Sequence, residues 1–254
     1  LSLGGGVPFW FKVETGLARY GFRRSEWAAA LARYRDTGQT NCVGVYSHFG
    51  AGMRDRLDDA LTRFDGFLAA AGAVIPDPFL TMAASSHAAT QRTSLPYRAV
   101  DPGRFLYGML PAAETGSVAS EPVVTAIESR LVQVSSVDEG LEMQIGYGDR
   151  LRLGRDGRLG VFPIGTFDGL PGQPPFGTVL IGGRPAPVVG RTLQHSIVDL
   201  SALRSAREGD RVTLVGRQGD AVVSFFEFAA ALNSTVTALH FTLVQKLEKS
   251  ALAQ

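Results

Sequence analysis

The sequence predicts an α/β region followed by a smaller, mostly β domain. In the first part, short apolar runs alternate with amphipathic stretches, a pattern typical of βα units with parallel strands. After a segment rich in small and turn-forming residues, short strand-like runs separated by glycine-containing turns take over. The chain has 254 residues, which is enough for two domains that each have a hydrophobic core.

Four βα units are expected in the first part. Apolar residues dominate each strand candidate, as in strands covered on both faces, and the candidates are residues 9–13, 42–46, 79–82 and 105–107. A helix is expected at residues 26–35, with Ser25 as its cap. A second is expected at residues 54–71, because Leu57, Leu61, Phe64 and Leu68 form one apolar stripe.

The domain boundary is expected within residues 112–122, giving domains at residues 1–115 and 123–254. The second domain reads as a small barrel or sandwich, with strands at residues 123–137, 159–163, 178–181, 186–189, 195–198 and 211–215. Turns are expected at Gly182-Gly183 and at residues 218–220. From Ser224 the pattern becomes helical, and a C-terminal helix is expected to carry the stripe Val236, Leu239, Leu243, Val244 and Leu247.

Composition excludes several classes of function. A formal net charge of +1 gives no strong field for nucleic acid or anionic lipid, and no apolar run is long enough to span a bilayer. Cys42 is the single cysteine, so no internal disulfide forms and a reducing, cytoplasmic setting is expected. The sequence has no P-loop, dinucleotide fingerprint or paired-cysteine set, and its four histidines are too scattered to predict a metal site.

Six motifs occur in a consistent order. Residues 12–22 (KVETGLARYGF) are similar to K-x-D-T-G-M-x-R-x-G, residues 45–49 (VYSHF) to Y-T-H-F, and residues 100–108 (VDPGRFLYG) to V-R-P-G-I-x-L-Y-G. Later, residues 145–148 (IGYG), 163–169 (PIGTFDG) and 187–191 (PVVGR) are similar to V-S-Y-G, P-I-G-Y-A-D-G and A-P-V-V-G-R. With these motifs the chain resembles the alanine racemases, fold-type III pyridoxal-phosphate enzymes.

The resemblance implies that residues 1–115 are the second half of a (β/α)8 TIM-like barrel and residues 123–254 the family's C-terminal β domain. The likeness begins near the fifth barrel strand. Four strands alone would leave two unpaired edges and an exposed apolar interior. Three explanations stay open: an omitted N-terminal segment, a partner chain that carries it, or two half-barrels that close on each other. The resemblance also implies a homodimer.

The resemblance implies pyridoxal phosphate as cofactor and three catalytic candidates. Arg19 matches the arginine that organises the catalytic tyrosine and the substrate carboxylate, and His48 matches a histidine near the cofactor ring. Leu151 stands where the family has its catalytic tyrosine and cannot transfer a proton, so Tyr147 is the remaining candidate. Alternatively, Arg19 is a solvated loop residue and His48 a structural barrel histidine. The Schiff-base lysine would precede Leu1.

The cofactor-binding candidates are His48, Ser86, His87, Asp101, Gly103 and Arg104. Asp101 replaces an arginine that contacts the pyridine nitrogen; an aspartate favours a protonated pyridinium, or else it caps or pairs locally. His87 replaces a phosphate-binding serine, so Ser86 or the amides of Gly103 and Arg104 are expected to meet the phosphate.

Further departures affect the expected activity. Ser234 replaces a phosphate-binding tyrosine, and Leu193-Gln194 replaces a methionine-aspartate pair near the substrate entrance. Lys12 matches a lysine that is often carbamylated in the family, or is an ion-paired surface group. His48 and His87 are also considered as an acid/base pair unrelated to the cofactor.

Two functions therefore stay open. One is an amino-acid racemase, an isomerase, or a related pyridoxal-phosphate enzyme that acts on amino acids. The other is a repurposed family member without the cofactor or racemase activity, which serves as a different catalyst or as a binding or scaffold subunit.

Overall fold

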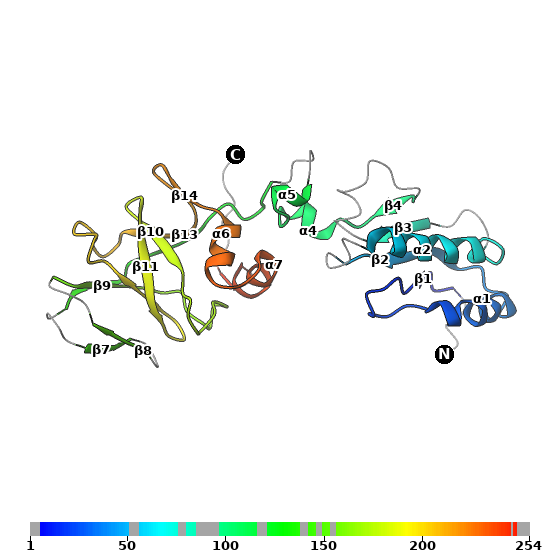
Figure 1. Ribbon diagram of the computed structural model, residues 1–254, viewed down its shortest axis with the longest axis horizontal. Helices are drawn as coiled ribbons and strands as arrows, with labels where there is room; N and C mark the ends of the chain where they lie inside the picture. Colours follow the sequence, from blue (N-terminus) through cyan, green and yellow to red (C-terminus); the bar gives the residue numbers. More distant parts are fainter. Residues whose placement is uncertain are drawn as a thin grey trace. The chain divides into compact units, whose positions relative to one another are not determined.

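The computed structural model divides into two compact units, Leu1–Glu121 and Pro122–Gln254 (Figure 1). The structure describes residues 6–50, 56–75, 80–84, 97–115, 121–137, 142–145, 149–152, 156–244 and 246–247. No helix among these residues is long and apolar enough to cross a membrane.

The first unit contains a four-stranded parallel sheet in the order β1-β2-β3-β4. The strands are β1 (Phe9–Lys12), β2 (Cys42–His48), β3 (Leu80–Ala84) and β4 (Ala99–Val100). The first three confirm the predicted strands to within a few residues. Aromatic and β-branched side chains in β1 and β2 suit a pleated sheet that is covered by helices.

The strand predicted at residues 105–107 is wrong. The fourth strand lies earlier, and Gly103–Leu106 form the helical turn α4 instead. Pro102 has no amide hydrogen with which to extend the sheet, while its carbonyl accepts a hydrogen bond from the Phe105 amide at 2.7 Å. The proline therefore ends the strand and starts a helical turn. A short helix α5 (Ala112–Thr115) follows.

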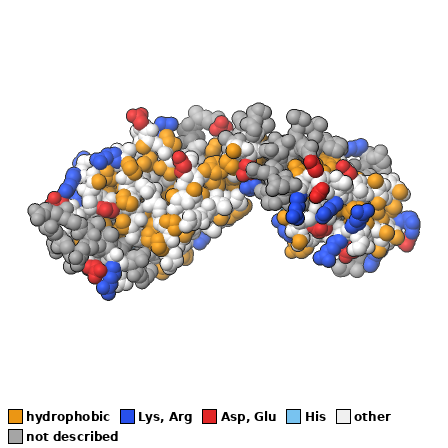
Figure 2. Space-filling view, in the orientation of Figure 1, with side chains coloured by type: hydrophobic (Ala, Val, Ile, Leu, Met, Phe, Trp, Pro, Cys, Tyr) orange, Lys and Arg blue, Asp and Glu red, His pale blue; other side chains and the backbone are white. Residues whose placement is uncertain are grey.

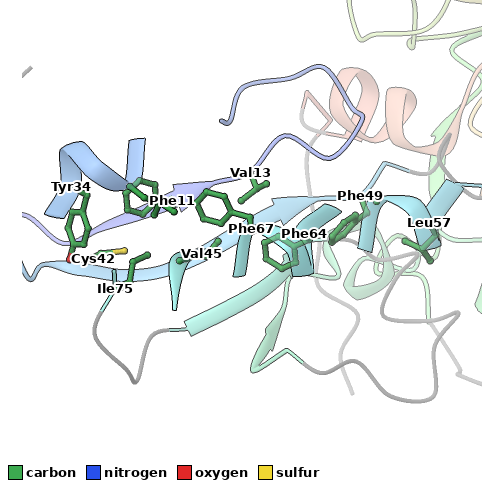
Figure 3. Close-up of a cluster of buried hydrophobic side chains, with 13 residues drawn as sticks. Phe11, Val13, Tyr34, Cys42, Val45, Phe49, Leu57, Phe64, Phe67 and Ile75 are labelled. Atoms are coloured by element: carbon green, nitrogen blue, oxygen red, sulfur yellow. The ribbon is translucent and has the colours of Figure 1, made fainter. Parts of the chain in front are cut away.

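Two helices, α1 (Trp27–Asp36) and α2 (Leu57–Ala71), pack on one face of the sheet. Figure 3 shows Phe11, Val13 and Val45 of the strand segments together with Phe64 and Phe67 of α2. The apolar stripe predicted for α2 is confirmed, with Leu57 and Phe64 buried and Leu61 and Leu68 packed at the edge of the same cluster.

The cap predicted for α1 is wrong. Ser25 lies within a short 3-10 turn, Arg24–Glu26, that precedes the helix. The carboxylate of Glu26 accepts the Arg23 amide hydrogen at 2.8 Å and so satisfies the start of this turn.

The second unit is built on antiparallel strands. Its larger sheet has the order β14-β13-β10-β11-β12-β9-β6, and β5 pairs with β13. The strands are β5 (Ile127–Arg130), β6 (Gln133–Ser136), β9 (Arg158–Phe162), β10 (Thr178–Ile181), β11 (Arg184–Arg191), β12 (Ser196–Asp199), β13 (Arg211–Gln218) and β14 (Ala221–Val223). A separate pair joins β7 (Glu142–Ile145) to β8 (Asp149–Arg152).

Most of the strands predicted in this unit are confirmed, but the one at residues 123–137 is two strands. It breaks at Leu131, which is buried and whose carbonyl accepts the Gly209 amide. Strands β7, β8 and β14 were not predicted. The turn glycines are confirmed: Gly182 and Gly183 join β10 to β11 with φ values of 59° and 73°, as a type I′ turn requires.

The C-terminal part is helical, but not one continuous helix. Ser224 caps α6 (Phe225–Ala231): its hydroxyl accepts the Glu227 amide hydrogen at 3.1 Å. After Asn233, which has a φ of 49°, come α7 (Val236–Leu239) and a π-helical turn, His240–Val244. Val236, Leu239 and Leu243 of the predicted stripe are buried.

Two arginines hold turns of this unit by binding backbone carbonyls. Arg191 is only 5% exposed; its guanidinium donates to the Ser196 hydroxyl at 3.0 Å and to the carbonyls of Pro171 and Phe176 at 2.6 and 3.2 Å. Arg158 donates to three carbonyls, those of Leu203, Arg204 and Ala206, at 2.8 to 3.0 Å.

Candidate functional site

The candidate site lies at the carboxyl end of the parallel sheet in the first unit. Lys12 is the last residue of β1, His48 is the last residue of β2, and Asp101 directly follows β4. Strands of a parallel sheet end at the same edge, and catalytic groups of α/β proteins gather there. Arg19 lies on the loop that leaves β1, so the sequence motifs that contain these four residues meet at one edge.

The loop that carries Arg19 is tightly folded. The Glu14 carboxylate accepts the amide hydrogens of Gly16 at 2.6 Å and Ala18 at 2.8 Å. Burial acts to raise the pKa of Glu14, but these amide hydrogen bonds outweigh it and the pKa is lowered. Ala18 and Tyr20 both have a φ of 54°, which side chains rarely adopt, so the loop holds Arg19 in a constrained position.

Lys12 connects the strand end to this loop. Its ammonium donates to the Arg19 carbonyl at 2.8 Å and lies over the rings of Tyr20 and Tyr46, 5.5 and 5.8 Å from their centroids. Burial, and secondly the nearby charge of Arg19, lower the pKa of Lys12. Tyr20 and Tyr46 were not predicted as site residues, although both lie inside the motifs.

His48 is surrounded by charges of both signs. Burial is the main cause that lowers the pKa of its imidazole, the cations Arg19 and Lys12 lower it further, and the Asp101 carboxylate opposes them. The imidazole is therefore neutral at pH 7 and can both donate and accept a hydrogen bond. The charges of Lys12, Arg19 and Asp101 therefore all act on the imidazole of His48.

A pair of buried hydroxyls lies beneath the edge. Thr15 Oγ1 and Ser47 Oγ are 2.8 Å apart, and Ser47 also donates to the Val13 carbonyl at 2.8 Å. These bonds tie the Arg19 loop to the strand that carries His48. Sequence reasoning missed them, and the only signal was a small hydroxyl residue in each of two neighbouring motifs.

The residues around α4 are engaged locally. The Asp101 carboxylate accepts the Gly103 amide hydrogen at 3.4 Å, a long contact. The Arg104 guanidinium lies 3.8 Å from the Glu114 carboxylate. Asp101 is exposed, so it keeps acceptor capacity beyond this contact.

Three predicted site residues, Ser86, His87 and Tyr147, lie outside the residues that the structure describes. The proposed pairing of His48 with His87 is outside them as well. Leu151 lies on β8, in the second unit. In that unit Leu193 and Gln194 line an open pocket of about 470 Å³, together with Phe167, Thr192 and His195. The Ser234 amide donates to the Ala229 carbonyl at the end of α6.

The donor set at the edge suits an anion. Two cations, Lys12 and Arg19, flank a neutral imidazole and one carboxylate, which matches a ligand that carries phosphate or carboxylate groups and a basic ring nitrogen. These residues therefore fit the phosphorylated pyridine aldehyde that the resemblance implies. Within the described ranges, no cluster of three or more His, Cys, Asp or Glu residues is arranged to hold a metal ion.

Comparison with known families agrees with the order of the two units. The model of the alanine racemase N-terminal domain matches residues 2–111, and that of the alanine racemase C-terminal domain matches residues 124–250.

Curated relatives carry the same name. An alanine racemase from Laribacter hongkongensis is 34% identical over 224 residues, covering 86% of this chain and 60% of the relative. A catabolic alanine racemase from Pseudomonas aeruginosa is 33% identical over 221 residues, with 85% and 60% covered. The chain thus spans about 60% of the length of the curated relatives it matches.

Solved structures extend the likeness to the fold. The biosynthetic alanine racemase from Pseudomonas aeruginosa superposes with a TM-score of 0.76 at 29% identity, over 95% of this chain and 66% of that one. An alanine racemase from Streptomyces lavendulae reaches 0.80 at 23% identity, covering 94% and 65%, and supports the fold alone.

Proposed function

This chain belongs to the alanine racemase family, and on that premise we propose that it forms part of an amino-acid racemase that depends on pyridoxal phosphate. The observation that carries the proposal is the gathering of Lys12, Arg19, His48 and Asp101 at the carboxyl edge of the sheet. This edge binds anions through its two cations, and both the cofactor and an amino-acid substrate are anionic.

In the proposed reaction the cofactor supplies an electron sink that makes the substrate Cα–H acidic. Arg19 binds the substrate carboxylate, and its constrained loop fixes that charge in place. His48, whose lowered pKa keeps its imidazole neutral at pH 7, would contact the cofactor ring without adding a third positive charge. Asp101 would accept a hydrogen bond from the protonated ring nitrogen, a role for which its exposed carboxylate has capacity.

The phosphate and the proton transfers are assigned to the remaining candidates. We assign the phosphate to Ser86, His87 and the amides that begin α4 at Gly103 and Arg104. We assign the second base to Tyr147, since Leu151 cannot hold a proton. The opposite base is the cofactor-binding lysine of the family, which has no match in the printed sequence.

A repurposed protein without the cofactor is the second candidate. Two observations favour it: Leu151 stands in place of the catalytic tyrosine, and Asp101 already accepts the Gly103 amide hydrogen. In that case the cationic edge binds a carboxylate or phosphate ligand without carbanion chemistry.

One experiment separates the two candidates. The full-length protein is mixed with pyridoxal phosphate, its visible absorbance is recorded, and borohydride is then added. The racemase proposal expects a protein-bound absorbance band that borohydride abolishes, together with loss of optical rotation from L-alanine. If the protein binds no pyridoxal phosphate at a saturating concentration, the racemase proposal is wrong and the repurposed protein remains.

The proposal also covers the oligomeric state and the cellular location of the protein. We propose a homodimer, as the family resemblance implies, and a cytoplasmic location, because the buried thiol of Cys42 suits a reducing compartment. Sedimentation of the full-length protein tests the dimer, and fractionation of cells tests the compartment.

A further inference from the structure

The loop that carries Arg19 is closed on itself. Its two ends meet where Val13 and Phe22 form an isolated β-bridge. The Glu14 amide donates to the Phe22 carbonyl at 3.1 Å, and the Glu14 carboxylate accepts two further amide hydrogens from inside the loop. These bonds fix the shape of the loop, but they do not fix its position against the neighbouring strand β2.

Two side chains of the loop contact β2 and the residue that ends it. Thr15 Oγ1 lies 2.8 Å from Ser47 Oγ. Leu17 packs where the strand ends, since a Cβ atom added to Gly50 would lie 2.8 Å from its Cδ1 atom. Thr15 and Ser47 are only 2% and 1% exposed, so water does not compete for their hydroxyls. Because Ser47 directly precedes His48, the hydroxyl pair joins the loop to the segment that holds the imidazole.

The hydrogen atoms of this pair have one arrangement. Ser47 donates its only hydroxyl hydrogen to the Val13 carbonyl at 2.8 Å. The Thr15 hydroxyl must therefore donate to the Ser47 oxygen. Such a chain of bonds is directional, and a shift of the loop would leave a buried hydroxyl without a partner. Two apolar side chains would fill the same space, but they would tolerate several positions of the loop.

We propose that Thr15 and Ser47 are positioning residues of the candidate site, whose hydroxyl pair sets the place of Arg19 relative to His48. Both hydroxyls are buried, so they act through Arg19 and not on a ligand. The inference rests on the proposed function in so far as Arg19 binds the substrate carboxylate. Its test locates the Arg19 charge without any ligand, so its failure is distinguishable from failure of the racemase proposal.

The titration of His48 measures how near the Arg19 charge lies, because burial lowers the pKa of the imidazole and the Arg19 charge lowers it further. It is followed by NMR on the full-length protein, with the signal assigned by its loss in His48→Gln. Arg19→Met removes the charge and sets the largest expected rise in the His48 pKa. Thr15→Val keeps the shape of the side chain and should give at least about half of that rise, since an exposed charge that moves away is screened by water. Thr15→Ser keeps the hydroxyl and should titrate like the parent protein.

Two further variants separate positioning from stability. Ser47→Ala removes the same bond from the β2 side and should also raise the His48 pKa. Thr213→Val removes a hydroxyl that is 0% exposed from β13 of the second unit and should leave the titration unchanged. Urea unfolding shows that each variant is folded under the conditions of the titration. A hydroxyl pair that only stabilises the core would lower the stability of Thr15→Val without moving the His48 titration.

The kinetics give a second test if the full-length protein racemises L-alanine. Thr15→Val should then raise the KM for alanine at least about threefold with a smaller change in kcat, because Arg19 binds the carboxylate in the ground state as well as in the transition state. Thr15→Ser should restore the parent KM. A fall in kcat alone would contradict a role that acts through substrate binding.

Two results of the titration would overturn the inference: an unchanged His48 pKa in folded Thr15→Val, or equal rises in Thr15→Val and Thr15→Ser. An equal rise in Thr213→Val would also overturn it, because the effect would not depend on the hydroxyl pair. A raised His48 pKa in Thr15→Val without racemase activity in the parent protein would support the inference and count against the proposed function.

Discussion

The ammonium of Lys12 donates a hydrogen bond to the backbone carbonyl of Arg19 at 2.8 Å, so the end of β1 holds the loop that follows it. Burial and then the positive charges of Arg19 and Lys12 lower the pKa of the His48 imidazole, and the Asp101 carboxylate opposes them. Figure 2 shows positive and negative side chains interspersed on the visible face of each unit, so neither sign of charge dominates that face.

The titration of His48 tests this arrangement directly. Removing a cation in Lys12→Met should raise the pKa of His48, whereas removing the opposing anion in Asp101→Asn should lower it. Both are read from the imidazole signals in NMR titrations of the folded protein. Lys246→Met, in the second unit, is the charge-matched control. Shifts in the same direction for the two site variants would contradict the arrangement.

Stability should depend on pH through the same imidazole. Because the folded-state pKa of His48 is lowered, the unfolded chain binds more protons between the two pKa values, and stability rises with pH there. Acidification through the ordinary histidine pKa, about 6.5, and down to the folded-state value should therefore destabilise the protein.

The His48→Gln variant should lose less stability over this range, as measured by urea unfolding at pH 7.5 and pH 5. His195→Gln serves as the control. An unchanged pH dependence in His48→Gln would argue against a lowered pKa.

Gly21 should not tolerate a side chain. Its φ is 102°, and a Cβ atom there would lie 2.8 Å from the Glu14 amide nitrogen. Gly21→Ala should cost more than about 1 kcal/mol of unfolding free energy and displace the Arg19 loop. Gly38→Ala, at a φ of 63° with nothing within 4 Å of the added atom, isolates backbone strain alone. Equal losses in the two variants would mean that the close approach at Gly21 contributes nothing.

Arg191 should be among the most sensitive positions of the second unit. Burial lowers the pKa of its guanidinium to about 10, so it stays charged at pH 7 and depends on its hydrogen bonds and on the Phe176 ring 5.2 Å away. Arg191→Met leaves the Pro171 and Phe176 carbonyls unpaired and should cost about 3 kcal/mol in denaturant unfolding.

Arg217→Met, on the exposed side of β13, is the matched control and should change stability by less than about 0.5 kcal/mol. A similar small loss in Arg191→Met would show that the buried hydrogen bonds are dispensable.

The sequence predicted the parts of the fold whose pattern is apolar. Strands β1 and β2 and the helix α2 follow from their hydrophobic residues, because burial decides their conformation. Phe105 was assigned to a strand for the same reason, but the preceding Pro102 decided the local backbone. Strands β7 and β8 carry mostly polar residues, for which periodicity gives little signal.

The sequence predicted only those residues of the candidate site that are matched by the family motifs. Arg19, His48 and Asp101 come from the motifs, and the structure adds Tyr20, Tyr46 and the hydroxyl pair that connects the loop to β2. These contacts join residues distant in sequence, which no local pattern reports. The burial of Arg191 was unpredictable for a related reason, since charged residues are usually exposed.

The hydrogen bonds that Arg158 donates to three backbone carbonyls affect how easily a protease can cut this segment. Arg204 and Arg207 are exposed and are chemically suited to cleavage by trypsin. A protease must draw several residues out into an extended strand before it can cut. Arg158 binds the carbonyls of Leu203, Arg204 and Ala206 and so keeps this segment folded onto the unit. The native protein should therefore resist nicking at a loop whose sequence alone looks vulnerable.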